Sequence, residues 1–305
     1  MPDREVRTVL DGMSYLECPR WHDGRLYVSD FYTQQVLAVD LDGGGDGVGG
    51  ADVIARVPGQ PSGLGWMPDG SMLVVSMRDR RILRVPDGGG EPEAHADLSH
   101  LAPWHLNDMV VDEAGRAYVG NFGFDLMSGA TIRATCVVRV DPDGSATIAA
   151  DDVRFPNGTV IFPDGRTLVV AETLAGRLTA FDVGDDGSLA NRRVWAQLSP
   201  APDTDDIGEL IAAGGVAPDG IALDAEGAIW VADAIGARVL RVREGGEIVE
   251  EVAAGTGVFA CGLGGADGRT LVMCAAPSFA EHERRDAREA QLLACEVDVP
   301  RAGLP

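Results

Sequence analysis

Residues 64–75 read LGWMPDGSMLVV, in which an apolar stretch enters a tight Asp-Gly turn and a second apolar stretch leaves it. Five further copies of this strand–turn–strand pattern occur, with turn glycines 41 to 62 residues apart. A repeat of about 40–50 residues built from antiparallel strands is typical of a β-propeller with one blade per repeat. We therefore predict an all-β, six-bladed β-propeller forming one domain over residues 1–305. The turn glycines are Gly24, Gly70, Gly115, Gly165, Gly227 and Gly268.

Two kinds of segment stand outside the repeat. The N-terminal segment 6–10 has no blade of its own, so we expect it to pair with 292–297, which would close the ring and cover an open strand edge. Three long segments, 122–135, 199–216 and 277–290, should emerge on one face and form the binding face. The last contains a short charged helix at 281–286, and the glycine-rich residues 43–50 are expected to form a surface loop.

Composition excludes several classes of function. The formal net charge is −23, which disfavours nucleic acid and anionic membranes as partners. All 25 basic residues are Arg, so Schiff-base lysine chemistry is excluded. The five cysteines are scattered, no apolar run is long enough to span a membrane, and no apolar leader segment precedes the repeats. We expect a cytoplasmic protein with reduced thiols; the oligomeric state is not predicted.

Polar residues recur eight positions before the turn glycines, where the innermost strand of each blade begins. Allowing one residue of slack in the first blade, four such positions carry carboxylates or amides. Equivalent positions of a propeller surround one channel, so these side chains should converge there. The six positions are Glu17, Ser62, Asn107, Asn157, Asp219 and, in the last blade, Ala260 or Cys261.

Converging carboxylates and amides would be poorly paired in a partly buried channel. A hard divalent cation resolves this, since Ca²⁺ takes six to eight oxygen ligands. Asn and Asp between Pro and Gly also form turns, but Glu17 is no turn former. We predict a metal held by Glu17, Asn107, Asn157 and Asp219. Ca²⁺ is the first choice; Mg²⁺, Mn²⁺ and Zn²⁺ stay open, although a ring without His disfavours zinc.

The loops at the same mouth carry aromatic side chains, an apolar rim suited to a substrate with a hydrophobic body. His105 precedes Asn107 by two residues, so it could reach a bound substrate as a proton donor or hydrogen-bond partner. We expect substrate contacts from Trp104, His105, Asn107 and Phe122. The other expected rim residues are Phe124, Met127, Phe259 and Phe279.

The second strand of four blades ends in a polar residue. These residues would either accept hydrogen bonds that orient the ring or terminate strands toward solvent. They are Asp30, Asn121, Glu172 and Asp233.

Several stretches resemble the family of senescence marker protein (regucalcin), gluconolactonase and luciferin-regenerating enzyme: LECPRW at 16–21, LND at 106–108, FPNG at 155–158, PDGRTL at 163–168 and APDG at 217–220. The resemblance covers nearly the whole chain. It implies a six-bladed propeller with one divalent metal in the channel. By motif position it implies Glu17, Asn157 and Asp219 as metal ligands, with Asn107 as ligand or substrate contact.

The chain also departs from that family. Sugar lactonases tend to have an Arg just before an Asn-Asp-Gly motif, where this chain has His105-Leu106-Asn107-Asp108-Met109. We therefore predict a metal-dependent lactonase or esterase that favours apolar or aromatic lactones over sugar lactones. Asp219 would act as general base or as nucleophile. The alternatives are a non-catalytic calcium-binding propeller and a phosphotriesterase-like hydrolase.

Overall fold

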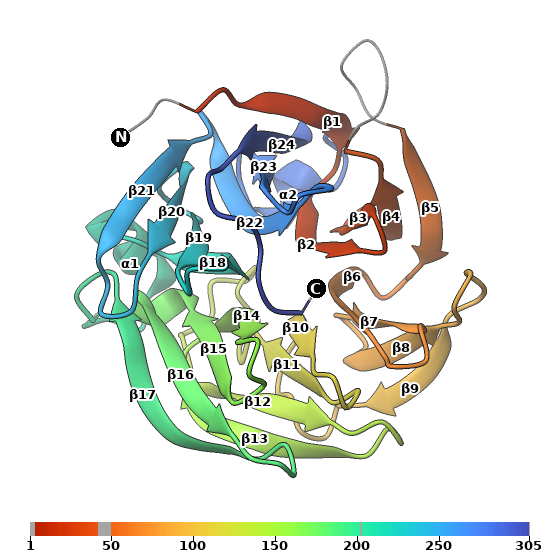
Figure 1. Cartoon of the computed structure of the whole chain (residues 1–305). Coiled ribbons are helices and arrows are strands. Elements are labelled where there is room, and N and C mark those ends of the chain that lie inside the picture. The colour runs from red at the N-terminus through yellow and green to blue at the C-terminus, as the bar shows by residue number, and fades with distance from the viewer. Residues whose placement is uncertain (1–3, 42–49, 202, 305) are drawn as a thin grey trace.

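The structure is a computed structural model that describes residues 4–41, 50–201 and 203–304. Six four-stranded antiparallel sheets surround a central axis, which confirms the predicted six-bladed propeller (Figure 1). The glycine-rich residues 43–49 lie outside the described residues. Blade one is β2 (Leu16–His22), β3 (Arg25–Asp30), β4 (Gln35–Val39) and β5 (Ala51–Arg56). Blade two is β6 (Pro61–Trp66), β7 (Met72–Ser76), β8 (Arg81–Val85) and β9 (Glu93–Asp97).

The other blades repeat this arrangement. Blade three is β10 (Leu106–Val111), β11 (Ala117–Asn121), β12 (Thr135–Val140) and β13 (Ala146–Val153). Blade four is β14 (Pro156–Ile161), β15 (Thr167–Glu172), β16 (Arg177–Val183) and β17 (Leu189–Gln197), with the 3₁₀ turn η1 (Thr173–Ala175). Blade five is β18 (Pro218–Leu223), β19 (Ile229–Asp233), β20 (Arg238–Val242) and β21 (Ile248–Ala253).

Blade six joins the two ends of the chain. It contains β22 (Gly257–Gly264), β23 (Thr270–Ala276), β24 (Ala290–Glu296) and, at its outer edge, β1 (Arg7–Met13). Strand β1 pairs antiparallel with β24, with Thr8 opposite Leu293. The predicted closure by the N-terminal segment is confirmed, and it covers the edge that β24 would otherwise expose.

Burial follows the position of each strand within its blade. Every residue of β18 and β19 is buried, because the inner strands lie between neighbouring blades. Such strands read as continuous apolar runs rather than alternating ones. The outer strand β21 is only partly buried. Large inner side chains such as Tyr118 and Trp230 therefore fill the space between sheets.

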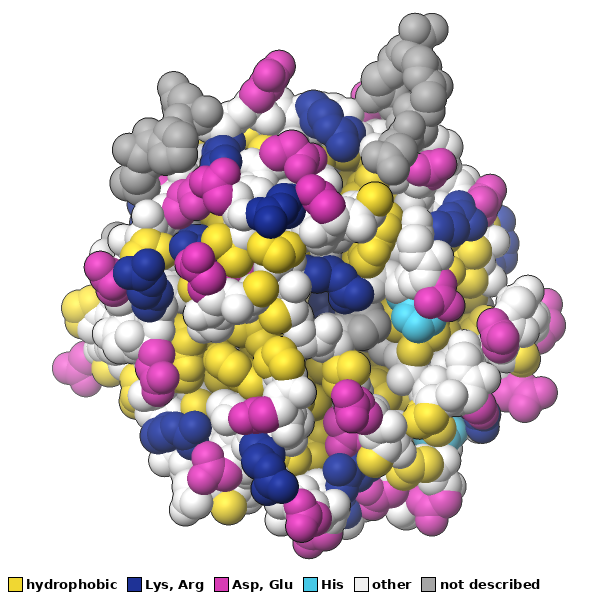
Figure 2. All heavy atoms as spheres, viewed as in Figure 1, with side chains coloured by type: hydrophobic (Ala, Val, Ile, Leu, Met, Phe, Trp, Pro, Cys, Tyr) yellow, Lys and Arg dark blue, Asp and Glu magenta, His cyan; other side chains and the backbone are white. Residues whose placement is uncertain are grey.

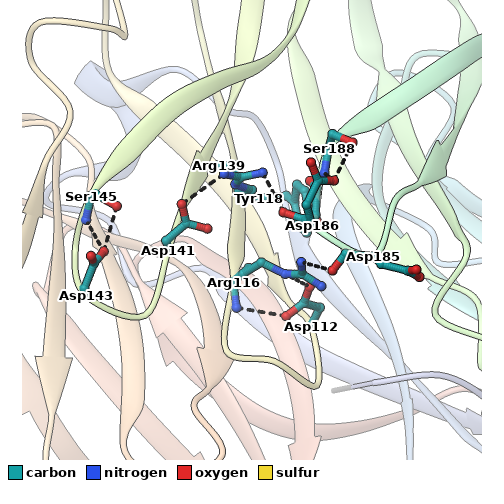
Figure 3. A network of polar contacts seen from close by, with 11 residues as sticks. Asp112, Arg116, Tyr118, Arg139, Asp141, Asp143, Ser145, Asp185, Asp186 and Ser188 are labelled. Carbon is teal, nitrogen blue, oxygen red and sulfur yellow. Dashed lines mark hydrogen bonds and ion pairs between the residues drawn. The ribbon is translucent and has the colours of Figure 1, made fainter.

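Adjacent blades are also joined by polar contacts (Figure 3). The turn between β16 and β17 of blade four lies against blade three. There the Tyr118 hydroxyl donates to the Gly187 carbonyl at 2.9 Å, and Arg139 donates to the Asp186 carbonyl at 3.0 Å. Arg139 also donates to the Asp141 carboxylate at 3.0 Å, because the five N–H donors of a guanidinium can serve several acceptors at once.

The C-terminal segment lies across one end of the channel, at the middle of the ring in Figure 1. The Ala302 N–H donates to the Leu223 carbonyl at 2.9 Å, and the Arg301 N–H donates to the Gly268 carbonyl at 2.8 Å. Asp, Glu and Arg side chains are interspersed over this face (Figure 2). The segment thus covers the end of the channel at which the Asp-Gly turns lie.

The three long segments lie at the opposite end. Segment 199–216 contains helix α1 (Ile207–Ala213), and segment 277–290 contains the predicted short helix, α2 (Glu281–Arg284). The first two segments touch, because the Ile132 N–H donates to the Asp205 carbonyl at 2.9 Å. Within residues 4–41, 50–201 and 203–304, no helix is long and apolar enough to cross a membrane.

Candidate functional site

Each innermost strand has an irregular register near the predicted ring position. In blade four Pro156 pairs with Glu172 and Thr159 pairs with Val170, so Asn157 falls within a β-bulge. Comparable shifts occur at or next to the ring position in the five other blades. A bulge bends its strand and redirects a side chain. The bulges thus account for polar side chains that leave an otherwise apolar strand toward the channel.

The glycine after the ring residue serves close packing. Gly158 does not have a positive φ, so backbone freedom is not what requires a glycine there. A Cβ at Gly158 would lie 2.7 Å from the backbone oxygen of Asp219 in the next blade, which is closer than real contacts allow. The absent side chain therefore lets neighbouring inner strands approach each other around the channel.

All four predicted ring residues line one cavity, of about 100 Å³. Their exposed fractions are 7% for Glu17, 6% for Asn107, 5% for Asn157 and 7% for Asp219. The structure therefore brings together the side chains that the repeat spacing selected. Ser62 is fully buried instead, and its hydroxyl lies 3.6 Å from the Cys18 sulfur.

Burial sets the electrostatics of the two carboxyl groups. It is the main cause that raises the pKa of Glu17 to about 8, and the nearby Asp108 charge adds to it. Burial is likewise the main cause that raises the pKa of Asp219 well above its ordinary value. Repulsion from the negative charges of Glu17 and Asp108 raises it further. Both shifts indicate a site that lacks positive charge at the ring itself.

The ring presents oxygen atoms that lack protein partners. Oδ1 of Asp219 is buried and has no hydrogen-bond partner among the described residues. The Asn107 amide donates from Nδ2 to the Pro156 carbonyl at 3.2 Å, and among the described residues nothing donates to its Oδ1. Asn157 Nδ2 lies 3.3 Å from the Thr173 hydroxyl. Because a hydroxyl can either donate or accept a hydrogen bond, the Asn157 amide could point either its nitrogen or its oxygen at Thr173.

This donor set fits a hard divalent cation. It consists of carboxylate and amide oxygens, the ligands that Ca²⁺ and Mg²⁺ prefer. In the described part of the chain, no group of three or more His, Cys, Asp or Glu side chains could hold a metal ion. Amide oxygens would therefore have to complete the ligand set beside Glu17 and Asp219.

A buried ion pair lies next to the ring. Arg20 Nη2 donates to both oxygens of the Asp108 carboxylate, at 2.7 and 2.9 Å, and to the Met109 carbonyl at 2.9 Å. The sequence analysis missed this pair. The sequence did contain a signal for it. The position after the ring residue is Gly in three blades but Asp in blade three, and a carboxylate buried there would need a cationic partner.

The polar residues that end the second strands do not face solvent; all four are fully buried. Asp30 accepts from the Tyr15 N–H at 2.9 Å, and Asp233 accepts from the Ala217 N–H at 3.1 Å. Each donor lies two residues before a ring carboxylate. Glu172 similarly accepts from the Arg154 N–H at 2.8 Å, three residues before Asn157. These carboxylates fix the backbone just before the innermost strands by accepting hydrogen bonds from its N–H groups.

Of the expected substrate contacts, His105, Asn107 and Phe122 line the cavity. Burial, followed by the positive charge of Arg78, lowers the pKa of His105. Trp104 stacks on His105, with 5.2 Å between ring centroids. Among the described residues that line the cavity, Trp104 is not included. The expectation of a direct Trp104 contact with substrate is therefore unsupported.

The cavity wall contains a further layer of residues, of which the sequence analysis selected only His105 and Phe259. A tier of six side chains lies two residues ahead of the ring positions, and all six line the cavity. The same repeat spacing, extended by two residues, would have found them. The tier is Tyr15, Gln60, His105, Phe155, Ala217 and Phe259.

All three long segments contribute to the wall, as expected for a binding face. Their side chains at the cavity are mostly apolar. The expected rim residues Met127, Phe259 and Phe279 are among the cavity-lining residues, whereas Phe124 is outside that set. The contributions of the segments are Phe122, Leu126, Met127, Ile207, Leu210, Ile211, Phe279 and Glu281.

Known proteins resemble this chain in sequence and in fold. It is 29% identical over 244 residues to pentonolactonase XacC of Haloferax volcanii, covering 79% of this chain and 70% of that protein. It is 28% identical over 278 residues to 6-deoxy-6-sulfogluconolactonase of Pseudomonas putida, covering 90% and 85%. A calcium-binding protein, regucalcin, from Agrobacterium tumefaciens has the same fold, with a TM-score of 0.77 at 20% identity over 99% and 97% of the two chains. Residues 16–277 match the model of the SMP-30/gluconolactonase/LRE-like region, and the chain belongs to that family.

Proposed function

We propose that this protein is a metal-dependent hydrolase that opens lactone rings. The observation that carries the proposal is the pair of buried carboxylates, Glu17 and Asp219, at a mostly apolar cavity, with one Asp219 oxygen lacking a partner among the described residues. Two relatives whose names denote lactonases, covering 79% and 90% of this chain, support the same reaction.

Glu17, Asn107, Asn157 and Asp219 would hold the cation, Ca²⁺ being our first choice because all four supply hard oxygen donors. When bound, a divalent cation would supply Lewis-acid stabilisation of the charge that develops on the lactone carbonyl oxygen. The protein positions the lactone carbonyl at the ring and surrounds the rest of the substrate with apolar side chains. Exclusion of bulk water there strengthens each electrostatic interaction.

Asp219 would act as general base in the hydrolysis. Its carboxylate takes a proton from a water molecule, whose oxygen attacks the carbonyl carbon of the lactone. The bond between that carbon and the ring oxygen then breaks, and the ring oxygen takes up a proton to give a hydroxy acid. His105 lines the same cavity, and its lowered pKa keeps it neutral near pH 7, with one ring N–H to donate to the leaving oxygen.

Asp219 could instead act as nucleophile, in which case its oxygen would bond to the carbonyl carbon before water releases the product. Hydrolysis in ¹⁸O-labelled water separates the two routes. A general base leaves Asp219 unlabelled after many turnovers, whereas a nucleophile acquires the label when water attacks the Asp219 carboxyl carbon of the anhydride and releases the product carboxylate.

The substrate that this cavity favours has an apolar or aromatic body. Leu174, Leu210, Phe155 and Phe259 all line the cavity. Apolar walls with a few directed polar groups fix both the affinity and the orientation of a small ligand. The position where sugar lactonases tend to carry Arg is occupied by neutral His105 or Leu106, which supports a preference for apolar lactones.

The proposal is tested by a panel of sugar, aliphatic and aromatic lactones, assayed after chelation and again after each metal is restored. We expect hydrolysis to require the restored metal, with higher kcat/KM for lactones with an alkyl or aromatic body than for gluconolactone. A phosphotriester included in the panel tests the phosphotriesterase alternative. Absence of lactone hydrolysis with every metal would overturn the proposed function.

A non-catalytic calcium-binding propeller would need room only for the ion and its waters. The cavity extends beyond the ring to side chains of all three long segments, which favours a site for a larger ligand. We also propose a cytoplasmic location, which the five free, buried cysteines support.

A further inference from the structure

The tier of six cavity residues ahead of the ring has two chemically different halves. Blades one, two and three contribute Tyr15, Gln60 and His105, each with a polar group that can donate a hydrogen bond. Blades four, five and six contribute apolar side chains at the equivalent positions. These are Phe155, Ala217 and Phe259.

Gln60 is held firmly in the polar half. Its backbone N–H donates to the Val57 carbonyl, and its own carbonyl accepts from the Met77 N–H, both at 2.9 Å. The φ angle of Gln60 is 76°, in the left-handed region that non-glycine residues rarely adopt. Such conformations persist where the surroundings hold them, and they cluster at binding and active sites.

The orientation of the Gln60 amide is determined by Arg78. Nε of Arg78 donates to Oε1 of Gln60 at 2.8 Å, and a guanidinium has donors only, so the amide oxygen must face it. Arg78 is held in turn by an ion pair with Glu281 of α2. The amide nitrogen of Gln60 is thereby turned away from Arg78.

That nitrogen is a donor without a partner. Gln60 is 8% exposed and lines the cavity, and among the described residues nothing accepts a hydrogen bond from its Nε2. A ligand that places only apolar atoms against this donor would remove water from it without replacing the hydrogen bond, which is unfavourable. A site of this kind discriminates against analogues that lack the acceptor atom.

We propose that Gln60 donates a hydrogen bond from Nε2 to an acceptor oxygen of the substrate other than its reacting ester group. The substrate is then an amphipathic lactone, with an ether, carbonyl or hydroxyl oxygen toward blades one to three and an apolar body against Phe155 and Phe259. This inference rests on the proposed lactonase function. It narrows the substrate class from apolar lactones to lactones with one directed oxygen.

The test uses ligand binding rather than turnover, so that it can fail independently of the proposed function. The probes are δ-lactams, cyclic amides that resist hydrolysis. They carry either a methoxymethyl or an n-propyl group, placed in turn at each ring carbon. The two groups have nearly the same shape and differ only in an oxygen in place of a methylene.

Dissociation constants are measured by calorimetry on the calcium-loaded protein. We expect the ether to bind roughly 10–100-fold more tightly than the propyl compound at one ring position, since its oxygen pairs the Gln60 donor. Equal affinity at every position, or no binding of either compound, would overturn the inference.

Three variants identify the donor, and a fourth, in the apolar half, is the control. Gln60→Glu retains an oxygen for Arg78 but lacks the N–H, and Gln60→Leu lacks both, so the affinity ratio should approach one in each. Arg78→Leu keeps the amide but releases its orientation and should lower the ratio partially. Phe259→Leu, in the apolar half, should weaken both ligands and keep the ratio. A ratio that survives in Gln60→Glu would show that another group donates, and the melting temperature of each variant establishes that it is folded.

Discussion

The backbone N–H of Ala217 donates to the carboxylate of Asp233 at 3.1 Å, so the end of β19 holds the start of β18, two residues before Asp219. Blade one repeats this arrangement, with Asp30 accepting from the N–H of Tyr15, two residues before Glu17. Ring side chains are thus positioned through the backbone by the neighbouring strand of their own blade. Groups that orient metal ligands in this way commonly contribute strongly to metal affinity.

We expect Asp233→Ala to weaken metal binding by about 10–100-fold, because the Ala217 N–H at the start of β18 loses its hydrogen-bond acceptor. The matched control is Asp224→Ala, also in blade five. Asp224 is equally buried but bonds Arg241 and the turn at the far end of β18. Both variants should be destabilised, whereas only Asp233→Ala should change the metal Kd measured by calorimetry. Equal loss of affinity in the two variants would contradict the positioning role.

Chelation should abolish hydrolysis and lower the melting temperature. The ring exists only in the folded state, so a cation at about 1,000 times its Kd adds about 4 kcal/mol to the free energy of unfolding. The measurement is a thermal melt and a lactone assay before chelation, after it, and after calcium is restored. Unchanged melting together with full activity after exhaustive chelation would contradict a metal site.

The stability of the metal-free protein should fall as pH rises from about 5 to about 8. Burial raises the pKa of Glu17 from 4.5 to about 8 and that of Asp219 in the same direction. The folded protein then keeps protons that the unfolded chain releases across this range, so the free energy of unfolding decreases with pH. Glu17→Gln should show a shallower decrease, and saturating calcium should remove it. An identical slope in Glu17→Gln would mean that Glu17 is not the titrating group.

Asp219→Asn and Glu17→Gln separate metal binding from chemistry. Each variant removes one negative charge from the ring, so each should bind metal more weakly. At metal concentrations that restore occupancy, Glu17→Gln should recover much of its kcat. Asp219→Asn should stay depressed by at least about 100-fold, because the base or nucleophile is gone. Equal recovery would make Asp219 a ligand alone and His105 the first candidate for the base.

The repeat spacing was enough to predict the blades, the closure by β1 and the position of the ring, because each depends on local patterns that recur. The Arg20–Asp108 and Arg78–Gln60 pairs were not predictable in this way. Arg20 and Asp108 are 88 residues apart, and no local pattern specifies which buried groups meet in the channel.

Two other differences have similarly local causes. A polar residue at a strand end, such as Asp233, looks the same in sequence whether it faces solvent or a buried N–H. Trp104 was expected at the cavity as one of the aromatic residues of the loops at its mouth, yet its ring stacks on the His105 imidazole. The loop sequence alone did not distinguish which of these two neighbouring residues lines the cavity.

The C-terminal segment across the far end of the channel has a kinetic consequence. Arg301 and Ala302 line a small cavity there together with Arg20 and Thr159, so residues 4–41, 50–201 and 203–304 form no second wide opening at this end. In the proposed reaction, a lactone and the hydroxy acid formed from it would therefore use the same mouth in turn. Because one mouth would serve both, the hydroxy acid would have to leave before the next lactone enters, and the rate of its release would limit turnover whenever ring opening is faster.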